Sequence, residues 1–528
     1  MQPIDVSPTK LETVREILGQ HVPELEVRAF GSRVDWTARE TSDLDLVLMT
    51  DAPMDIGKMV ALKAAFTKSN LPFRVDIVDW ASTSESFRNV IQREYVKLQL
   101  WVRSKQVGVP KKRREVVLSE IAELVMGQSP PGSTYNDAGD GLPFFQGVKD
   151  FNYRYPTPRV FCSAPARIAQ PGEILLSVRA PIGRVNVADR ECATGRGLAI
   201  IRPLVPSDAR YLEFVLRHME SNWDVLESGG SVFGNATKRD LQSLPLPWPS
   251  DGTERQAIAH ILGTLDDKIE LNRRMNETLE AMARTLFKSW FVDFDPVRDK
   301  MEGRWRRGET LPGLPAHLYD LFPDRLVDSE LGEIPEGWEV KTLGDCFDLT
   351  MGQSPPGSTY NELGEGLPFF QGNADFGSRY PKKRRHCTAP TRLARPDDTL
   401  VSVRAPVGAI NMAWERCCIG RGVGALRHRS GLRSFTYYSI WTLQPVLAEY
   451  KHTGTVFGAI NREQFEALMV IEPPPDLINC FETYSREWDD HIQTNTLESG
   501  ALAAQRDALL PRLVSGKVRV GEELQHAV

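Results

Sequence analysis

Two segments of this chain are copies of one another, and this duplication limits the possible folds more than any other feature of the sequence. The run from Met126 to Asn136 recurs without change from Met351 to Asn361, an offset of 351 − 126 = 225. The copies extend from about 113 to 295 and from about 338 to 518, so the period far exceeds the ~20 to 50 residues of a solenoid repeat. The sequence therefore predicts a whole domain present twice. Shorter motifs recur with it: Gly141–Gly147 and Gly366–Gly372, Ser177–Pro181 and Ser402–Pro406, Gly195–Gly197 and Gly420–Gly422, and Val232–Gly234 and Val456–Gly458.

A long helix is predicted at the end of each copy. Mostly apolar residues follow one another at alternating steps of four and three, which is the spacing of a coiled-coil seam. The two series are displaced by 481 − 258 = 223 and place Asn272 and Asn495 at equivalent seam positions, where a polar side chain fixes the register. We predict that the helices pair with each other; the alternative is two amphipathic helices that each pack on their own domain. The seams are Ile258, Leu262, Leu265, Ile269, Asn272, Asn276, Leu279, Ala283, Leu286 and Trp290, and Phe481, Ser485, Trp488, Ile492, Asn495, Ser499, Leu502, Arg506, Leu509 and Leu513.

The sequence of each copy predicts a mixture of short strands and short helices. Gly, Pro and Ser separate apolar runs such as Glu173–Val178 and Gly197–Ile201, which are typical of strands. We predict a multidomain α/β protein, in which an N-terminal α/β domain is followed by two similar α/β domains separated by two long coiled-coil helices. A Pro- and Gly-rich connector between the copies is expected to be largely irregular, with apolar anchors. The predicted boundaries are 1–105 for the first domain, 106–250 and 338–475 for the repeated domains, 251–295 and 476–528 for the helices with the tail, and 296–337 for the connector.

Three aspartates of the first domain are placed along the sequence as the ligands of a metal site would be. Asp43 and Asp45 lie on one predicted strand and project from the same side, because side chains alternate along a strand. Asp76 lies on a later strand-like run and completes a three-carboxylate set of the kind that holds two Mg²⁺ ions for nucleotidyl transfer. Gly31 lets the backbone approach a phosphate, and Ser32 supplies hydrogen-bond donors to it.

With these motifs in this order, residues 1–105 resemble the minimal nucleotidyltransferases of the DNA polymerase beta-like superfamily. The resemblance implies that the three aspartates are catalytic Mg²⁺ ligands and that the Gly-Ser pair binds a nucleoside triphosphate. One position departs from the family pattern, since Trp36 stands where small members usually carry a glycine. Catalysis is a separate question from fold, because a fused copy of an enzyme domain can persist as a binding or regulatory module.

The composition excludes several classes of protein. With 41% hydrophobic and 25% charged residues, the chain has the make-up of an ordinary soluble protein. Its net charge of −6 argues against indiscriminate coating of nucleic acid but leaves room for local basic faces, such as the runs Lys111–Arg114 and Lys382–Arg385. The seven cysteines include no Cys-x-x-Cys pair, which predicts neither a disulfide framework nor a zinc site. No apolar run reaches membrane length and no signal pattern opens the chain, so we expect a cytoplasmic protein without membrane partners.

The duplicated domains with their trailing helices resemble the DNA-specificity subunit of type I restriction-modification systems. The resemblance implies that each copy is a target-recognition domain that reads one half of a split site in double-stranded DNA, without a cofactor. It also implies that the two coiled-coil helices pair antiparallel as a spacer and dock two methyltransferase subunits, and that restriction (translocase) subunits complete the complex. A rod of ~37 residues rising ~1.5 Å each spans ~55 Å, more than one turn of DNA. The segments that carry the resemblance are Gly127–Asn136, Gly352–Asn361, the two Phe-Phe-Gln-Gly runs, Leu265–Ile269, Trp290–Phe294 and Ser329–Trp338.

Methylation and cleavage are expected from partner subunits. The chain has no Asn-Pro-Pro-Tyr-type methyltransferase motif, and Ser515–Lys517 lacks the preceding glycine of a P-loop. Two other functions stay open. In one, the first domain is an active nucleotidyltransferase that the duplicated domains merely target to a protein, an RNA or a small molecule. In the other, the repeats build an assembly scaffold that has no role with nucleic acids.

The candidate DNA contacts are polar residues that recur in loop-like contexts of both copies. Arginine matches guanine O6 and N7, and glutamine can address adenine, although contact with phosphate is the more frequent role for any one residue. Residues that distinguish two half-sites ought to differ between the copies, and these mostly do not, so we expect half-sites that are near inverted repeats. The candidates are Gln128, Gln146, Arg179, Arg196 and Lys238 in the first copy, and Gln353, Gln371, Arg404, Arg421 and Arg462 in the second.

Overall fold

The computed structural model describes most of the chain and divides it into two compact units, Met1–Lys112 and Arg113–Val528. The described residues are 4–22, 25–35, 37–38, 42–50, 54, 56–69, 71–83, 87–88, 91, 95–99, 113–220, 235–450 and 458–520. Trp36, Lys111, Lys112, the Val232–Gly234 motif and the first two residues of its second copy lie outside them. All seven cysteines are free thiols. None of the helices in the described part is long and apolar enough to span a membrane.

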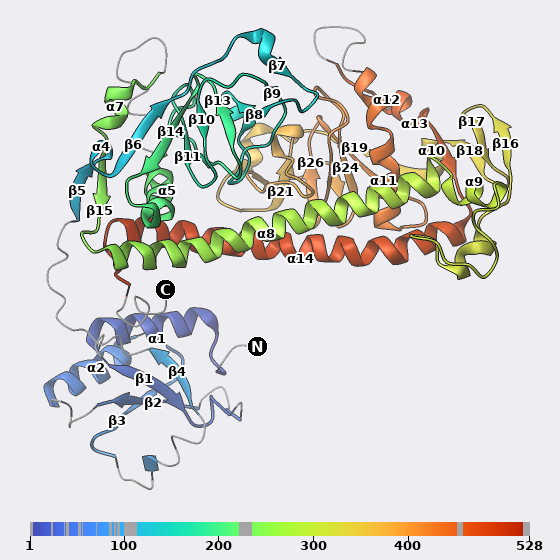
Figure 1. Ribbon diagram of the computed structural model, residues 1–528. Coiled ribbons are helices and arrows are strands. Elements are labelled where there is room, and N and C mark those ends of the chain that lie inside the picture. The colour runs from blue at the N-terminus through green and yellow to red at the C-terminus, as the bar shows by residue number, and fades with distance from the viewer. Residues whose placement is uncertain are drawn as a thin grey trace. The chain divides into compact units, whose positions relative to one another are not determined.

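The first unit is a four-stranded sheet with two helices. Its elements are α1 (Pro8–His21), β1 (Glu26–Phe30), β2 (Leu44–Met49), α2 (Ile56–Lys68), β3 (Val75–Asp79) and β4 (Val96–Gln99), shown in Figure 1. The strand order is β3-β2-β1-β4, and β2 is antiparallel to β1 but parallel to β3. A parallel pair needs a crossover connection, which α2 provides. Buried residues such as Leu18, Val27, Leu46 and Leu62 form the core between the helices and the sheet.

The first repeated domain is built on two small sheets, with strand orders β12-β11-β14-β6 and β10-β13-β8-β9-β7. Its strands are β5 (Arg114–Val117), β6 (Ala122–Met126), β7 (Tyr135–Asn136), β8 (Leu142–Phe145), β9 (Phe161–Cys162), β10 (Ile168–Ala169), β11 (Ile174–Ser177), β12 (Val185–Val187), β13 (Cys192–Thr194), β14 (Leu198–Pro203) and β15 (Pro245–Trp248). Its helices are α4 (Leu118–Ile121), α5 (Ala209–His218) and α7 (Lys238–Gln242).

The second repeated domain has the same two sheets, with orders β19-β27-β24-β25 and β20-β22-β21-β26-β23. Its strands are β18 (Glu339–Thr342), β19 (Phe347–Met351), β20 (Tyr360–Asn361), β21 (Leu367–Phe370), β22 (His386–Cys387), β23 (Leu393–Ala394), β24 (Thr399–Ser402), β25 (Ile410–Met412), β26 (Cys417–Ile419), β27 (Val423–His428) and β28 (Met469–Glu472). Its helices are α10 (Leu343–Cys346), α11 (Arg433–Thr442), α12 (Gln444–Glu449) and α13 (Arg462–Glu466).

Two helices of 40 residues each, α8 (Gly252–Phe291) and α14 (Pro475–Val514), lie side by side along the second unit (Figure 1). Asn272 Nδ2 lies 3.3 Å from Ser499 Oγ, and Asn495 Nδ2 donates to Asn276 Oδ1 at 2.9 Å. Residue numbers therefore rise along one helix as they fall along the other, so the pair is antiparallel. Asn272 and Asn495 are both buried, and these hydrogen bonds satisfy their amide NH₂ groups, which would otherwise be costly there.

Each end of this helical rod is built into the core of one repeated domain. Ile258 near the start of α8 and Leu513 near the end of α14 belong to the core of the first domain. Phe287 and Trp290 near the end of α8 and Phe481 near the start of α14 belong to the core of the second. The two domains are therefore attached at opposite ends of the rod.

The connector between the copies is more regular than its sequence predicts. It contains α9 (Asp295–Met301) and a hairpin of β16 (Leu326–Ser329) and β17 (Gly332–Pro335). Trp305 is almost fully buried, its ring lies edge-on to Phe322, and its Nε1 donates to the Glu309 carbonyl at 2.9 Å. The prediction of a largely irregular segment is wrong here, because α9 and the hairpin give the connector regular structure. The predicted apolar anchors are present, since Trp305 and Phe322 join the core at the end of α8.

Candidate nucleic-acid interface

The recurring glycine motifs of the first repeated domain converge on one loop cluster. A Cβ atom on Gly127 would lie 2.2 Å from the Gly195 carbonyl oxygen, and one on Gly197 would lie 2.1 Å from that of Gln146. No side chain fits at such distances, so these positions require glycine. Backbone hydrogen bonds from Gln128 N to Thr194 O and from Val178 N to Gly197 O, at 3.0 and 2.9 Å, join the same loops.

The predicted contacts of the first copy gather at this cluster. Gln128, Arg179 and Arg196 are exposed, and Gln146 is half-buried. Arg179 forms a β-bridge with Asn235, which brings in the segment leading to α7 and its exposed first residue, Lys238. Among the described residues, the two guanidinium groups have no hydrogen-bond or ion-pair partner. Free, exposed cations beside amide donors suit a polyanionic ligand such as nucleic acid.

The second copy repeats this arrangement with small differences. Cβ atoms on Gly352 and Gly422 would lie 2.2 and 2.3 Å from carbonyl oxygens, and Gln353, Arg404 and Arg421 are exposed. The guanidinium groups of these two arginines also have no partner within the described part of the chain. Two candidates are already engaged: Arg462 Nε donates to Glu466 Oε1 at 2.8 Å, and Gln371 Oε1 accepts from Arg385 Nη1 at 3.2 Å.

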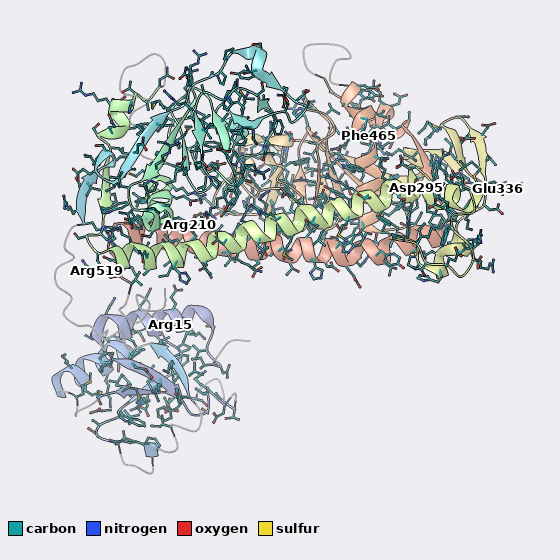
Figure 2. All side chains as sticks on the ribbon, in the orientation of Figure 1. Arg15, Arg210, Asp295, Glu336, Phe465 and Arg519 are labelled. Atoms are coloured by element: carbon teal, nitrogen blue, oxygen red, sulfur yellow. The ribbon has the colours of Figure 1, made fainter. Side chains whose placement is uncertain are left out.

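A buried ionic junction fastens the first domain to the rod. Asp266 of α8 is fully buried and accepts three hydrogen bonds of 2.7 Å, from Tyr153 Oη, Arg217 Nη1 and Arg506 Nη1. Burial opposes ionisation of Asp266, but the two arginines outweigh it and hold the pKa of this carboxyl below its ordinary value. At the rim, Arg210 of α5, which is labelled in Figure 2, donates to Asp267 at 2.8 Å. Because Arg506 belongs to α14, this junction ties the domain to both helices.

The second domain has its own junction. Arg379 is buried, donates to Asp489 Oδ1 of α14 at 2.7 Å, and lies with its guanidinium 3.4 Å from the centre of the Tyr437 ring. Tyr438 Oη also donates to Asp489, at 3.2 Å. Burial opposes the charge on Arg379, but Asp489 and its neighbours outweigh it and raise the arginine pKa well above its ordinary value. Sequence reasoning missed both junctions, although the placement of charged Arg506 at a predicted seam position was a signal for a buried counter-ion.

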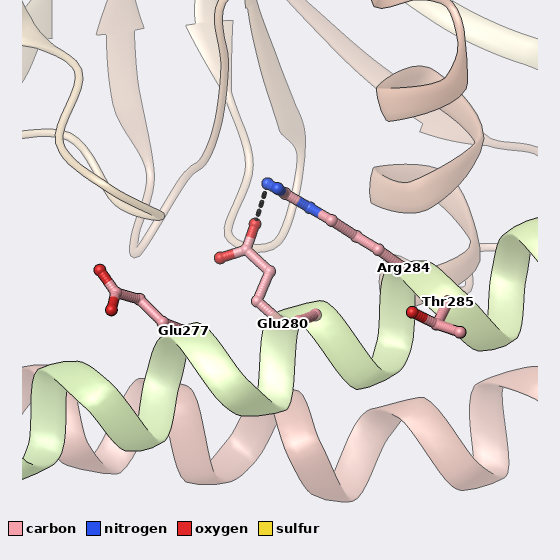
Figure 3. A pocket seen from close by; sticks show the side chains of 5 residues that line it. Glu277, Glu280, Arg284 and Thr285 are labelled. Atoms are coloured by element: carbon pink, nitrogen blue, oxygen red, sulfur yellow. Dashed lines mark hydrogen bonds and ion pairs between the residues drawn. The ribbon is translucent and has the colours of Figure 1, made fainter. Parts of the chain in front are cut away.

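A groove along α8 is a poorer candidate for nucleic acid. Its cavity volume is about 390 Å³, and it is lined by Glu277, Glu280, Ala281, Arg284 and Thr285 (Figure 3). Glu280 pairs with Arg284 and accepts a hydrogen bond from Tyr437 Oη at 3.3 Å. Glu277 pairs with Arg273 outside the groove. The groove lining itself holds two carboxylates and one arginine, an acidic balance that disfavours phosphates, and none of the loop-motif residues lines it.

The first unit brings its predicted site residues close together. Asp45 of β2 lies opposite Asp76 in the parallel pairing with β3, and Asp43 directly precedes β2. Burial and the nearby charges of Asp76 and Asp43 raise the pKa of Asp45. Gly31 has a φ of +78°, and a Cβ on it would lie 2.6 Å from Asp45 Oδ2, so the turn that also carries Ser32 closes tightly over this carboxylate.

The metal site itself stays a prediction. Within the described residues, no group of three or more His, Cys, Asp and Glu side chains has an arrangement that would hold a metal ion. The Asp76 carboxylate instead lies 3.4 Å from Arg74 Nε at the surface. The donors nevertheless have the right chemistry for Mg²⁺, because they are hard carboxylate oxygens and the crowding of like charge on Asp45 is what a cation would relieve.

Comparison with known proteins agrees with both parts of this architecture. The family model for the type I restriction modification DNA specificity domain matches residues 110–281, and that for polymerase beta nucleotidyltransferases matches residues 12–99. The putative type I restriction enzyme MjaX specificity subunit of Methanocaldococcus jannaschii is 30% identical over 333 residues, 62% of this chain and 72% of that protein. The MjaIX specificity subunit of the same organism is 26% identical over 443 residues, 78% of this chain and 95% of that protein.

The first unit has a relative of its own. It is 47% identical over 96 residues to the probable protein adenylyltransferase MntA of Haemophilus influenzae. These 96 residues are 18% of this chain, and the match covers 84% of MntA. The chain belongs to the specificity subunits of type I restriction enzymes and carries at its N-terminus a domain of the polymerase beta-like nucleotidyltransferase family.

Proposed function

We propose that this chain reads a bipartite target in double-stranded DNA, one half with each loop cluster, for a type I restriction-modification complex that acts in the cytoplasm. The observation that carries the proposal is a pair of exposed clusters, one on each domain, whose arginines have no side-chain partner among the described residues and whose domains are built onto opposite ends of one rod. The candidate DNA contacts are Gln128, Gln146, Arg179, Arg196, Lys238, Gln353, Gln371, Arg404, Arg421 and Arg462.

The rod supports the proposal through its length. Forty residues of α8 rising ~1.5 Å each give ~60 Å, whereas one turn of DNA is ~34 Å. A buried ion pair fastens each domain to the rod within its length, at Asp266 of α8 for the first domain and at Asp489 of α14 for the second. Because separating the partners of a buried pair is costly, each domain keeps its place along the rod. The rod therefore acts as a spacer that sets the distance between the two half-sites.

The outer surface of the rod is also the proposed docking face for methyltransferase subunits. Leu271, Met275 and Met282 of α8 and Leu497 of α14 are 51%, 41%, 46% and 60% exposed. The α8 residues are four and seven positions apart, which places them on one helix face. Large apolar side chains left in water mark protein contact sites, and methionine adapts readily to a partner surface. We propose that two methyltransferase subunits bind here, that restriction subunits complete the complex, and that DNA recognition needs no cofactor.

Footprinting tests this proposal. The chain purified with its methyltransferase subunits should protect two short DNA segments about one helical turn or more apart, and methylation mapping in cells should find the same bipartite motif only when the chain is present. A complex that assembles but protects DNA without regard to sequence would show that the loop clusters do not read bases.

A second activity is proposed for the first unit, namely nucleotidyl transfer to a protein. The juxtaposition of Asp45 and Asp76 beneath the Gly31 turn supports it, as does the likeness to a protein named as an adenylyltransferase. Asp43, Asp45 and Asp76 would hold Mg²⁺, which supplies charge neutralisation for a nucleoside triphosphate placed against Gly31 and Ser32.

Label transfer from radiolabelled ATP with Mg²⁺ tests this second activity. The full chain should label a protein acceptor, the D43A/D45A variant should not, and E12A on the exposed face of α1 should behave as the wild type. Equal labelling by wild type and D43A/D45A would rule out this site as the catalyst.

A further inference from the structure

The two copies hold one glutamine identically but surround it differently. Gln146 and Gln371 follow β8 and β21 at the repeat offset, 371 − 146 = 225. The backbone N–H of each donates to the carboxylate of an aspartate four residues on, Asp150 or Asp375, at 2.7 Å. The backbone therefore presents both glutamines in the same way, and any difference in what they recognise must come from neighbouring side chains.

That difference lies on the adjacent strand-like segment. Val160 and Arg385 occupy equivalent positions, 385 − 160 = 225, and their carbonyls accept from Phe144 N and Phe369 N at 2.8 and 2.9 Å. Val160 is half-buried and packs into an apolar cluster with Phe144. An arginine cannot fill that place, and Arg385 is exposed with Nη1 3.2 Å from Gln371 Oε1.

This contact changes the hydrogen bonds that each glutamine can offer. An arginine can only donate, so Arg385 takes one of the two acceptor positions of the Gln371 carboxamide oxygen and adds its own guanidinium donors beside the glutamine NH₂ group. No hydrogen bond of the Gln146 carboxamide occurs among the described residues, so this group keeps both a donor and an acceptor. Adenine presents one donor and one acceptor in the major groove, whereas guanine presents two acceptors, O6 and N7.

We propose that Arg385, acting together with Gln371, makes the second domain read guanine at the position where Gln146 of the first domain reads adenine. This inference rests on the proposed function, because it requires that the loop clusters face the bases. It also modifies the expectation of near inverted repeats: the half-sites resemble each other everywhere except at this position. In this proposal the neighbouring Lys382 and Arg384 contact phosphates, whereas Lys383 is paired with Glu415.

Reciprocal substitutions in the full chain, assembled with its methyltransferase subunits, test the proposal. R385V should change the methylated motif at one position of the second half-site from guanine to adenine, and V160R should make the opposite change in the first. Replacing that guanine by 7-deazaguanine, which lacks N7, should weaken binding of the wild type about tenfold or more and leave binding of R385V unchanged. R384V is the matched control, because the first copy also has arginine there, Arg159; it should weaken binding to all duplexes equally.

The outcomes distinguish a failure of the proposed role of Arg385 from a failure of the proposed function of the whole chain. If R385V weakens binding uniformly, lowers its salt dependence and leaves the motif unchanged, Arg385 contacts phosphate and the inference fails. Identical half-sites in the wild type also overturn it. If R385V fails to assemble, V160R decides alone: a first half-site that stays unchanged contradicts the proposal. A wild type without any bipartite motif would instead refute the proposed function itself.

Discussion

The buried carboxylate of Asp266 should be the most sensitive single point in the attachment of the first domain to the rod. Asp266→Ala removes three hydrogen bonds of 2.7 Å and leaves Arg217 and Arg506 buried with fewer partners. Breaking a buried ion pair by deleting one partner costs about 3–5 kcal/mol. Arg217 keeps Glu213 at 2.9 Å and Arg506 keeps Asp507 at 2.7 Å, so we expect the lower end, about 3 kcal/mol.

Hydrogen exchange followed by mass spectrometry measures this effect locally, which suits a chain of several domains whose unfolding is not a single transition. A loss of about 3 kcal/mol in the free energy of local unfolding corresponds to roughly 100-fold faster amide exchange in α5 and the adjoining ends of α8 and α14. Each ~1.4 kcal/mol changes the exchange rate by a factor of ten. Asp267→Ala is the matched control. The Asp267 side chain is 61% exposed, and exposed pairs contribute about 0–1 kcal/mol.

The pH dependence gives a second readout for the same residue. The pKa of Asp266 is lowered in the folded protein, so its stabilising contribution is present above the ordinary pKa of about 4 and is lost as pH falls through the folded-state value. The exchange difference between wild type and Asp266→Asn should therefore shrink only in acid below about pH 4. Exchange of Asp266→Ala within a few-fold of wild type, or an equal effect from Asp267→Ala, would refute the junction as the attachment point.

Three further predictions concern the loop clusters and the first unit. Gly127→Ala should abolish sequence-specific binding, because its methyl group would meet the Gly195 carbonyl at 2.2 Å, whereas Gly132→Ala, which meets nothing within 4 Å, should bind normally in the same electrophoretic shift assay. Arg196→Ala and Arg421→Ala should each lower DNA affinity, and titration against salt should show a slope smaller by about one if the lost contact is to phosphate; an unchanged affinity would remove that arginine from the interface. Deleting residues 1–105 should leave the methylated motif unchanged, since both repeated domains have complete cores without them, and loss of modification by a deletion variant that still assembles would contradict this.

Local patterns in the sequence were sufficient for the elements and for their repetition. The period of the seam residues predicts two long helices because neighbours at three and four positions share a helix face, and the structure has helices at Gly252–Phe291 and Pro475–Val514. The apolar run Glu173–Val178 becomes β11, and the order of Gly-Ser and three aspartates matches a domain whose family the comparisons establish. Each of these signals depends on residues close together in the chain.

Only the tertiary structure decided which distant residues meet. Asp266 and Arg506 are 240 positions apart and form one buried pair, because the antiparallel register of the rod brings them level, and no local pattern encodes that register for a charged residue. The roles of the glycines that the two copies share likewise became apparent only in the structure, where Gly127 lies against the Gly195 backbone. Identical motifs concealed the difference between Gln146 and Gln371, since hydrogen-bonding capacity depends on what packs beside a side chain as well as on its identity.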